Sequence, residues 1–241
     1  MTTWLVVRCC YMRKLIFGNW KANKSESEVE QWLAEFTVAT KNLDLSKLEP
    51  VIAPPYPFLF KLRNQPAISV GVQDISPFSA GSYTGAIAAL NLKNFQVKYT
   101  LVGHSERRKY FMETAAAVSQ KITQALINGI KPIVCVDETT LDELIAKVDE
   151  ADLRQCLIAY EPVASIGTGN NAPLTAVKTF AEKVKEACGE VPYLYGGSIN
   201  ENNIAEYLLV SDGVIIGGAS LSATQFVKVL KAAQGELTHG S

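Results

Sequence analysis

Short apolar runs recur along the chain, and polar residues do not alternate with apolar ones inside them. Such runs are typical of strands that are covered on both faces, as in a parallel sheet. Many of their residues are β-branched or aromatic, which also favours strands. We predict eight strands, at Lys14–Asn19, Pro50–Ala53, Ile68–Gln73, Tyr99–Gly103, Lys131–Val136, Cys156–Tyr160, Tyr193–Gly196 and Gly213–Ile216.

Between most of these runs, apolar residues recur at the spacing of one helix face. Ser25 and Glu28 form the capping-box pattern that opens a helix, and Gly129 is placed to end another. Pro173 fits the first turn of a third helix. The apolar stripes are Val29, Trp32, Leu33 and Phe36, then Val118, Ile122, Ala125 and Leu126, then Val177, Phe180, Ala181 and Val184, and finally Phe226, Val227 and Leu230.

Strands that alternate with helices predict parallel pairing through crossover connections. Eight such units close a (β/α)8 barrel of the α/β class. An open doubly wound sheet is the alternative, and a GxGxxG turn after the first strand would favour it, but the sequence has none there. The stretch between Glu138 and Cys156 is short for a full crossover, so we expect a shortened fifth crossover helix.

The length of the chain suits one barrel domain. Its 241 residues are 48% hydrophobic, enough to bury a large core, and barrels of this type run to about 250 residues. Met12 directly precedes the first predicted strand. We therefore expect an N-terminal extension at residues 1–11, the barrel at residues 12–234 and a tail at residues 235–241.

The charge balance and the cysteine content bear on which partners, metals and cellular locations we expect. The chain has 23 Lys and Arg against 24 Asp and Glu, which gives no basic surface for nucleic acid or an anionic membrane. No apolar run approaches the roughly 20 residues of a membrane span. The five cysteines are an odd number without metal-ligand spacing, so we expect neither a disulfide framework nor a metal, and a cytoplasmic location.

Polar residues that could take part in catalysis lie at the ends of three of the predicted strands. Asn19 and Lys21 come at the end of the first strand, His104 after the fourth and Glu161 after the sixth. Each alone has an ordinary structural explanation, as a capping, hydrogen-bonded or solvated side chain. The active site of a barrel lies at the C-terminal ends of its strands, so the four together predict a catalytic rim.

Glycine pairs follow the last two strands. Gly196 and Gly197 precede Ser198 after the seventh strand, and Gly217 and Gly218 follow the eighth. Loops at these places commonly bind phosphate, because main-chain N–H groups without a neighbouring β-carbon approach oxygen atoms closely. Two ordinary tight turns are the alternative explanation.

Five motifs occur together in this chain: GNWKAN, VGHSERR, AYEPVASIGTG, YGGS and GGASL. In this order they resemble the triosephosphate isomerase family, from about Arg13 to Ala233. The resemblance implies a barrel that interconverts dihydroxyacetone phosphate and glyceraldehyde 3-phosphate without a cofactor or metal.

The resemblance also implies a role for each polar residue. Glu161 matches the base that moves a proton between C1 and C2 of the substrate, and His104 matches a neutral imidazole that bonds both substrate oxygens. Lys21 would stabilise the enediolate and touch the phosphate, while Asn19 would orient the substrate oxygens. Main-chain N–H groups of Gly167, Ser198, Gly217 and Gly218 would bind the phosphate.

Two loops carry further implications of the resemblance. Residues Pro162 to Ala172 match the family's lid, and residues Ser76 to Ala89 resemble its protruding interface loop. The second similarity implies a homodimer in which Thr84 reaches the neighbouring site near Asn19 and Glu106. Glu106 is then expected to anchor the site rather than to act as a second base. Gln73 and Arg107 are expected to support the site.

The lid motif departs from the family pattern. Ala164 stands where Trp is usual, Ser165 where Ala is usual, and Asn170-Asn171-Ala172 where Lys-Thr-Ala or Lys-Val-Ala is common. We therefore expect a more mobile lid with intact chemistry. A weak barrel kept as a binding protein, and a barrel acting on another sugar phosphate, are the alternative functions.

Overall fold

In the computed structural model, which describes residues 13–162 and 171–239, eight parallel strands form a closed barrel in chain order. β1 pairs with β2 on one side and with β8 on the other, which closes the sheet. The predicted barrel is confirmed, and the open doubly wound alternative is wrong. The strands are β1 (Lys14–Asn19), β2 (Leu48–Ala53), β3 (Ser69–Val72), β4 (Val97–Val102), β5 (Lys131–Val136), β6 (Leu157–Tyr160), β7 (Tyr193–Tyr195) and β8 (Gly213–Ile216).

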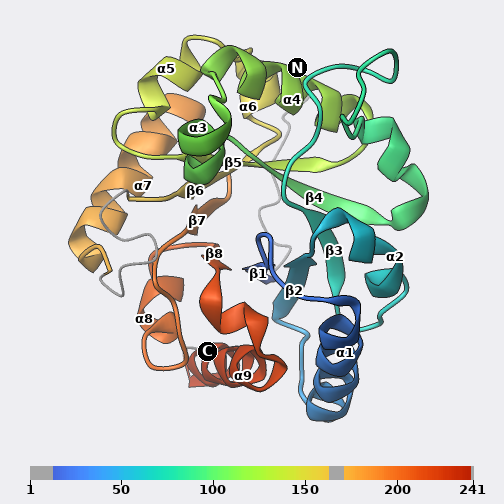
Figure 1. The fold of residues 1–241 in the computed structure, drawn as a ribbon. Helices are drawn as coiled ribbons and strands as arrows, with labels where there is room; N and C mark the ends of the chain where they lie inside the picture. The colour runs from blue at the N-terminus through green and yellow to red at the C-terminus, as the bar shows by residue number, and fades with distance from the viewer. Residues whose placement is uncertain (1–12, 163–170, 240–241) are drawn as a thin grey trace, which may run out of the picture.

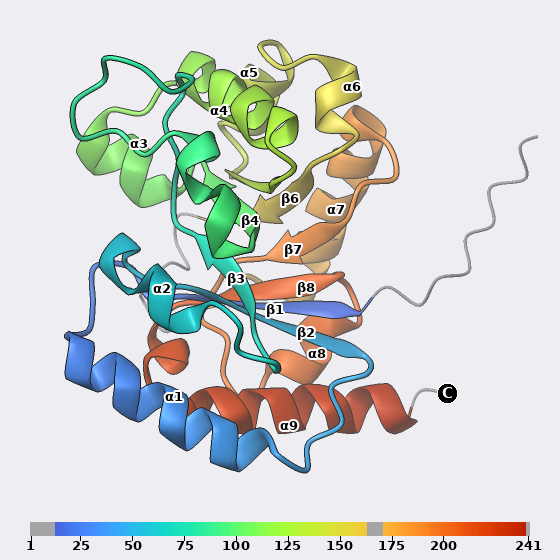
Figure 2. The same ribbon diagram turned by 90° about the vertical axis from the view of Figure 1, so that its right-hand side faces the viewer.

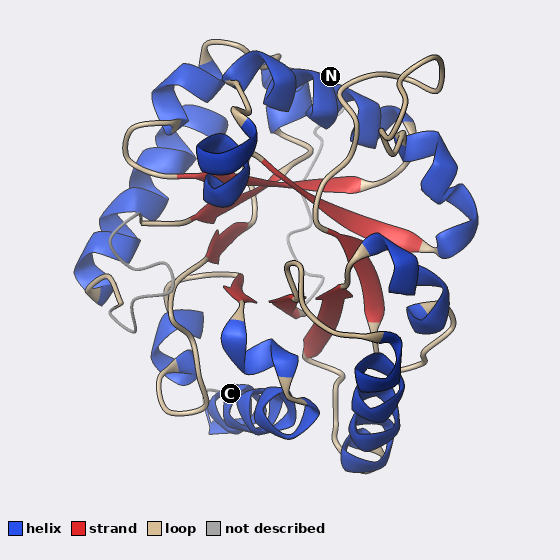
Figure 3. Cartoon of the chain, in the orientation of Figure 1, coloured by secondary structure: helices blue, strands red, loops and turns tan. Residues whose placement is uncertain are grey.

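Helices surround the barrel as an outer ring (Figures 1 and 3). α1 and α9 lie side by side along one flank (Figure 2). The connection from β5 to β6 carries two short helices, α5 and α6. The α-helices are α1 (Glu26–Thr40), α2 (Leu59–Leu62), α3 (Ser105–Phe111), α4 (Ala115–Ile127), α5 (Leu141–Ile145), α6 (Glu150–Leu153), α7 (Leu174–Cys188), α8 (Ile204–Leu208) and α9 (Ala223–His239), and the 3-10 helices are η1 (Tyr56–Phe58), η2 (Ala89–Phe95) and η3 (Gly218–Leu221).

Local signals explain where several helices begin and end. The Ser25 N–H donates to the Glu28 carboxylate at 2.6 Å ahead of α1, as the capping-box pattern predicts. Pro173 differs from the prediction by one residue. Its ψ of 144° is extended, so it lies at the N-cap of α7 rather than in the first turn.

The core has two layers separated by the sheet. Side chains such as Leu15, Phe17 and Leu101 fill the barrel interior, while Ile16, Ile52 and their neighbours pack against the helices. Both faces of the strands are therefore buried, which is why the apolar runs show no polar alternation. Within the described residues, no helix is both long and apolar enough to cross a membrane.

Candidate active site

A cavity of about 280 Å³ opens at the C-terminal ends of the strands. This volume is close to the lower end of the range for small-molecule sites, about 300–1,000 Å³. The predicted residues Asn19, Lys21, His104, Glu161, Ser198, Gly217 and Gly218 all line it, together with Gly196, Gly197, Ile199, Asn200, Ile215 and Ala219. Gly167 lies outside the described residues. The barrel therefore brings groups from β1, β4, β6, β7 and β8 to one place.

Glu161 is held directly after β6, where its N–H donates to the Val136 carbonyl at 2.8 Å. Its carboxylate is almost fully buried and lies 3.4 Å from Nε2 of His104. The Ser105 N–H donates to the other carboxylate oxygen at 3.3 Å. Gly196 passes so close that a β-carbon there would lie 2.8 Å from Cγ of Glu161. The carboxylate is thus excluded from water in a narrow space beside the imidazole.

His104 is fixed by the start of α3. Its Nδ1 accepts a hydrogen bond from the Glu106 N–H at 3.1 Å, so that nitrogen carries no proton. The neutral ring then holds its proton on Nε2, the atom that faces Glu161. This geometry presents a neutral hydrogen-bond donor to the cavity.

Lys21 has a left-handed backbone with φ of 51°. Its N–H donates to Oδ1 of Asn19 at 3.0 Å, and its carbonyl accepts from Nε2 of Gln73 at 2.8 Å. Its ammonium group lies 2.6 Å from the Glu106 carboxylate. Two side chains therefore hold the Lys21 backbone, and Glu106 supports its charge from outside the lining of the cavity.

The glycine loop after β8 is secured by two tryptophans. The indole N–H groups of Trp20 and Trp32 both donate to the Ser220 carbonyl at 3.0 Å. The Ser220 hydroxyl in turn donates to the Gly217 carbonyl at 2.6 Å. η3, which begins at Gly218, is thereby attached to the turn after β1 and to α1, a connection that the sequence analysis missed.

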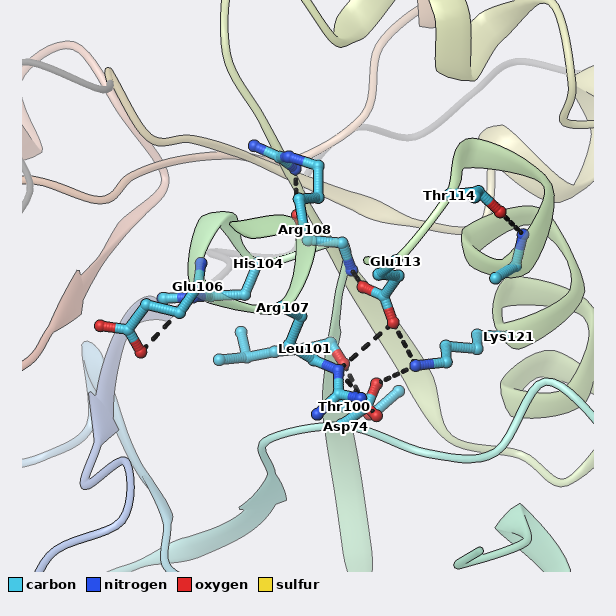
Figure 4. Close-up of polar contacts among 12 residues, drawn as sticks. Asp74, Thr100, Leu101, His104, Glu106, Arg107, Arg108, Glu113, Thr114 and Lys121 are labelled. Atoms are coloured by element: carbon cyan, nitrogen blue, oxygen red, sulfur yellow. Dashed lines mark hydrogen bonds and ion pairs between the residues drawn. The ribbon is translucent and has the colours of Figure 1, made fainter. Parts of the chain in front are cut away.

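A group of four charged side chains lies to one side of His104 (Figure 4), and we call it the charged quartet: Asp74, Arg107, Glu113 and Lys121. Nε of Arg107 lies 2.9 Å from Asp74 and 3.3 Å from Glu113. Lys121 is 2.5 Å from Asp74 and also pairs with Glu113. Glu113 also accepts the N–H of Gly103 at 3.0 Å, the residue directly before His104. The quartet thus connects the end of β3 with α3 and α4 and supports the chain that carries the imidazole.

Burial raises the pKa of Asp74, although the positive charges of Lys121 and Arg107 oppose that shift. The sequence analysis named Arg107 as a support but missed the other members of the charged quartet. Lys121 did give a signal, because it lies three residues after Val118 on a face that is otherwise apolar and buried. A buried lysine requires a partner.

Cys135 lies on β5 near the carboxylate of Glu161. Burial raises the pKa of its thiol, and the nearby charge of Glu161 raises it further. Cys135 is therefore a neutral, buried neighbour of Glu161 rather than a nucleophile.

Only part of the predicted lid segment belongs to the described residues, because residues 163–170, including Ala164, Ser165 and Asn170, lie outside them. Beside the segment, the Tyr160 hydroxyl donates to the carboxylate of Glu138. Thr84 lies on the exposed part of the loop at residues 76–89 and is not among the residues that line the cavity. In residues 13–162 and 171–239, no group of three or more His, Cys, Asp and Glu side chains is arranged to hold a metal ion.

Comparison with known proteins identifies a single family. The triosephosphate isomerase family model matches residues 14–233. Similar curated proteins named triosephosphate isomerase occur in Herminiimonas arsenicoxydans, with 36% identity over 92% of this chain and 99% of the relative, and in Delftia acidovorans, with 38% identity over the same shares. The relative from Mesomycoplasma hyorhinis is 34% identical over 90% of this chain and 98% of its own length.

Proposed function

Because the chain belongs to the triosephosphate isomerase family, we propose that its cavity divides the isomerisation between a carboxylate base and a neutral imidazole. The protein is an isomerase that interconverts dihydroxyacetone phosphate and D-glyceraldehyde 3-phosphate. The observation that carries the assignment of roles is the placement of Glu161 and His104 3.4 Å apart in one cavity.

Glu161 acts as the base. It takes the proton from C1 of dihydroxyacetone phosphate to give an enediolate, and it returns a proton to C2 to give the aldehyde. Its burial supports this role, because it holds the carboxylate inside the cavity, beside His104 and away from bulk water. The strand before it fixes its backbone, so the side chain needs only rotamer changes to reach the substrate.

His104 acts as the neutral acid. While Glu161 removes the carbon-bound proton from C1, Nε2 of His104 gives its proton to the oxygen on C2. The ring then takes the proton of the hydroxyl on C1, so that it is neutral again when the aldehyde forms. A neutral imidazole is a weak acid, and its acidity is closer to that of an enediol than the acidity of an imidazolium is. The contact between Nδ1 and the Glu106 N–H supports this role, since it keeps the ring in the required tautomer.

Lys21 and Asn19 complete the polar side of the cavity. The ammonium of Lys21 stabilises the negative charge of the enediolate, and this effect is strong where water is excluded. Asn19 orients the substrate oxygens. Glu106 positions the ammonium of Lys21 through their 2.6 Å contact, as an anchor and not as a second base.

The phosphate binds to main-chain N–H groups of Ser198, Gly217 and Gly218, joined by Gly167. The first three line the same cavity as Glu161, and the tryptophan contacts keep η3 in place. Residues 162–172 form the lid, which excludes water from the enediolate and prevents loss of its phosphate.

Assembly and location are part of the same proposal. A homodimer forms through the loop at residues 76–89, and Thr84 of each subunit supports the neighbouring site. The exposed aromatic pair Phe78 and Tyr83 on this loop, with ring centroids 4.4 Å apart, supports an interface there. We assign the protein to the cytoplasm, in keeping with the buried, unpaired state of the three cysteines in the described residues.

A coupled assay of the purified chain in both directions tests the proposal. We expect rapid turnover of both triose phosphates without added metal or cofactor. Turnover of a longer aldose phosphate, with none of the triose phosphates, would instead indicate a different sugar phosphate isomerase. A folded chain that binds phosphate and turns over neither substrate would support the binding-protein alternative.

A further inference from the structure

We propose that Asn171 is a positioning residue for the phosphate-binding loop at residues 196–200. The inference rests on the proposed function, because it concerns the phosphate subsite of that cavity. The sequence analysis gave this side chain no role. It noted only that Asn171 stands where the family often has Thr or Val. Its contacts lie within the described residues.

Asn171 reaches from the chain before α7 to the loop after β7. Its Nδ2 donates to the Ser198 carbonyl at 2.9 Å, and its Oδ1 accepts from the Tyr195 hydroxyl at 3.3 Å. One amide thus contacts both the last residue of β7 and a residue that lines the cavity.

The backbone beside Asn171 is itself fixed. The Ala172 N–H donates to the Tyr195 hydroxyl at 3.0 Å, and the Ala172 carbonyl accepts from the Tyr207 hydroxyl at 2.7 Å. Tyr195 and Tyr207 are buried and stack on each other with ring centroids 4.5 Å apart. Asn171 therefore extends from a rigid base, and its amide can impose a direction on the loop.

The contact with Ser198 matters because a peptide unit is planar. Its N–H and C=O point in opposite directions, so fixing the carbonyl fixes the whole unit. The Ser198 carbonyl also accepts from Nδ2 of Asn203 at 3.0 Å, and the Gly197 carbonyl accepts from the Ile199 N–H at 3.0 Å. The peptide units on both sides of Ser198 are thereby oriented, including the one that carries the N–H proposed to bind phosphate.

Asn171 and Asn203 differ in what they connect. Asn203 lies at the N-cap of α8, and its Oδ1 accepts from the Asn200 N–H at 2.9 Å, so it organises the loop locally. Asn171 ties the same carbonyl to a different part of the barrel, the entrance of α7. We therefore assign to Asn171 the placement of the loop relative to the rest of the cavity.

The test is Asn171→Ala in the full chain, with binding of inorganic phosphate measured by calorimetry. Asn171→Ala removes both hydrogen bonds of the amide, and we expect the dissociation constant to rise about three- to tenfold, an effect of the size of one net hydrogen bond. For turnover, KM of the triose phosphates should rise while kcat/KM for unphosphorylated glyceraldehyde stays at the parent value. A general loss of structure would lower kcat/KM for the triose phosphates and for glyceraldehyde alike. Measuring glyceraldehyde therefore separates a role in positioning from a role in stability.

Two further variants make the test decisive. Asn171→Thr keeps a small polar side chain that is too short to bridge both partners, and it should weaken phosphate binding as Asn171→Ala does. Asn128→Ala is the matched control, since it removes a side-chain donor to a main-chain carbonyl, at 2.8 Å, on the far end of α4. It should leave phosphate binding unchanged.

Unchanged phosphate affinity in both Asn171 variants would overturn the inference, as would an equal loss in Asn128→Ala. Because calorimetry needs no turnover, the inference can fail while the isomerase is fully active. Equally, an inactive parent would refute the proposed function, but the phosphate affinities of the parent and the variants could still be compared.

Discussion

The backbone of Lys21 is in a conformation that residues with a β-carbon disfavour, and neighbouring side chains hold it there. The Gln73 amide contributes through two contacts, to the Lys21 carbonyl at 2.8 Å and to the Ala53 carbonyl at 3.0 Å. It thus joins the Lys21 turn to the end of β2. The position of the ammonium in the cavity therefore depends on a side chain that is not among the residues lining that cavity.

We predict that Gln73→Leu lowers kcat/KM about ten- to thirtyfold, because it removes two hydrogen bonds of about 1 kcal/mol each, to the carbonyls of Lys21 and Ala53. The measurement is steady-state turnover of glyceraldehyde 3-phosphate. Gln155→Leu is the control, since Gln155 donates to the Ala151 carbonyl at 3.0 Å on the exterior of the barrel. Equal activity of the two variants would argue against a supporting role for Gln73.

At this scale, the sequence predicted which residues meet in the cavity, and the family resemblance named some of their supports, such as Gln73, but other contacts that hold the site were missed. Asn19 ends a strand, and His104 and Glu161 each follow one, so the topology of a barrel was enough to bring them together. The contact of Asn171 with Ser198 depends on side-chain directions across elements separated by 27 positions in the chain. Periodicity carries no information about such contacts.

At the scale of elements, the end of α4 shows how a single residue sets a boundary. Gly129 has φ of +72°, the Ile130 N–H donates to the Ala125 carbonyl at 2.9 Å, and the Gly129 N–H donates to the Leu126 carbonyl at 3.1 Å. These two bonds form a Schellman motif. The left-handed residue turns the chain from α4 into β5.

We predict opposite effects for two Gly→Ala substitutions. Gly129→Ala should lower the free energy of unfolding by about 1–2 kcal/mol, because alanine is strained at positive φ. Gly235→Ala should raise it by about 0.5–1 kcal/mol, because Gly235 lies inside α9 and alanine favours a helix. At both positions, no atom from elsewhere in the described part of the chain lies within 4 Å of the added β-carbon, so differences in packing do not affect the comparison.

Urea denaturation of the two variants and the parent measures both changes. A stabilised Gly129→Ala, or a destabilised Gly235→Ala, would contradict the roles assigned to the two glycines. The pair is matched because each change adds one methyl group to open space.

Strands proved more predictable than short helices. The predicted ranges of β1, β5 and β8 agree with the structure, because each is a compact apolar run with clear polar or glycine neighbours. Helices of four or five residues, such as α2 and α8, complete barely one turn. A run of that length cannot show a helical period, so no individual bounds could be predicted for them.

At the scale of the whole molecule, the loop at residues 76–89 is the part that a lone barrel does not explain. Residues 78–86 are all exposed, and the stacked pair of Phe78 and Tyr83 is 42% and 45% exposed. An ordered aromatic pair on the surface favours burial against a partner. The proposed homodimer supplies that burial.

We predict that Tyr83→Glu shifts the protein from dimer to monomer in sedimentation velocity, because a charge in an apolar interface remains unpaired. Activity per chain should fall with the loss of the dimer. Phe60→Glu is the control, since Phe60 is 64% exposed on α2 and lies outside the loop. An active monomeric parent, or dissociation of the control as well, would contradict the proposed interface.

The central claim is that Glu161 is the base, and the most direct measurement is kcat of Glu161→Gln in the coupled assay. Glutamine keeps the shape of the side chain but cannot accept the proton, so we predict a decrease of about 10²- to 10⁴-fold. Glu182→Gln, an exposed position on α7, should keep the parent kcat. Parent-like turnover by a folded Glu161→Gln would show that another group removes the proton and would contradict the account.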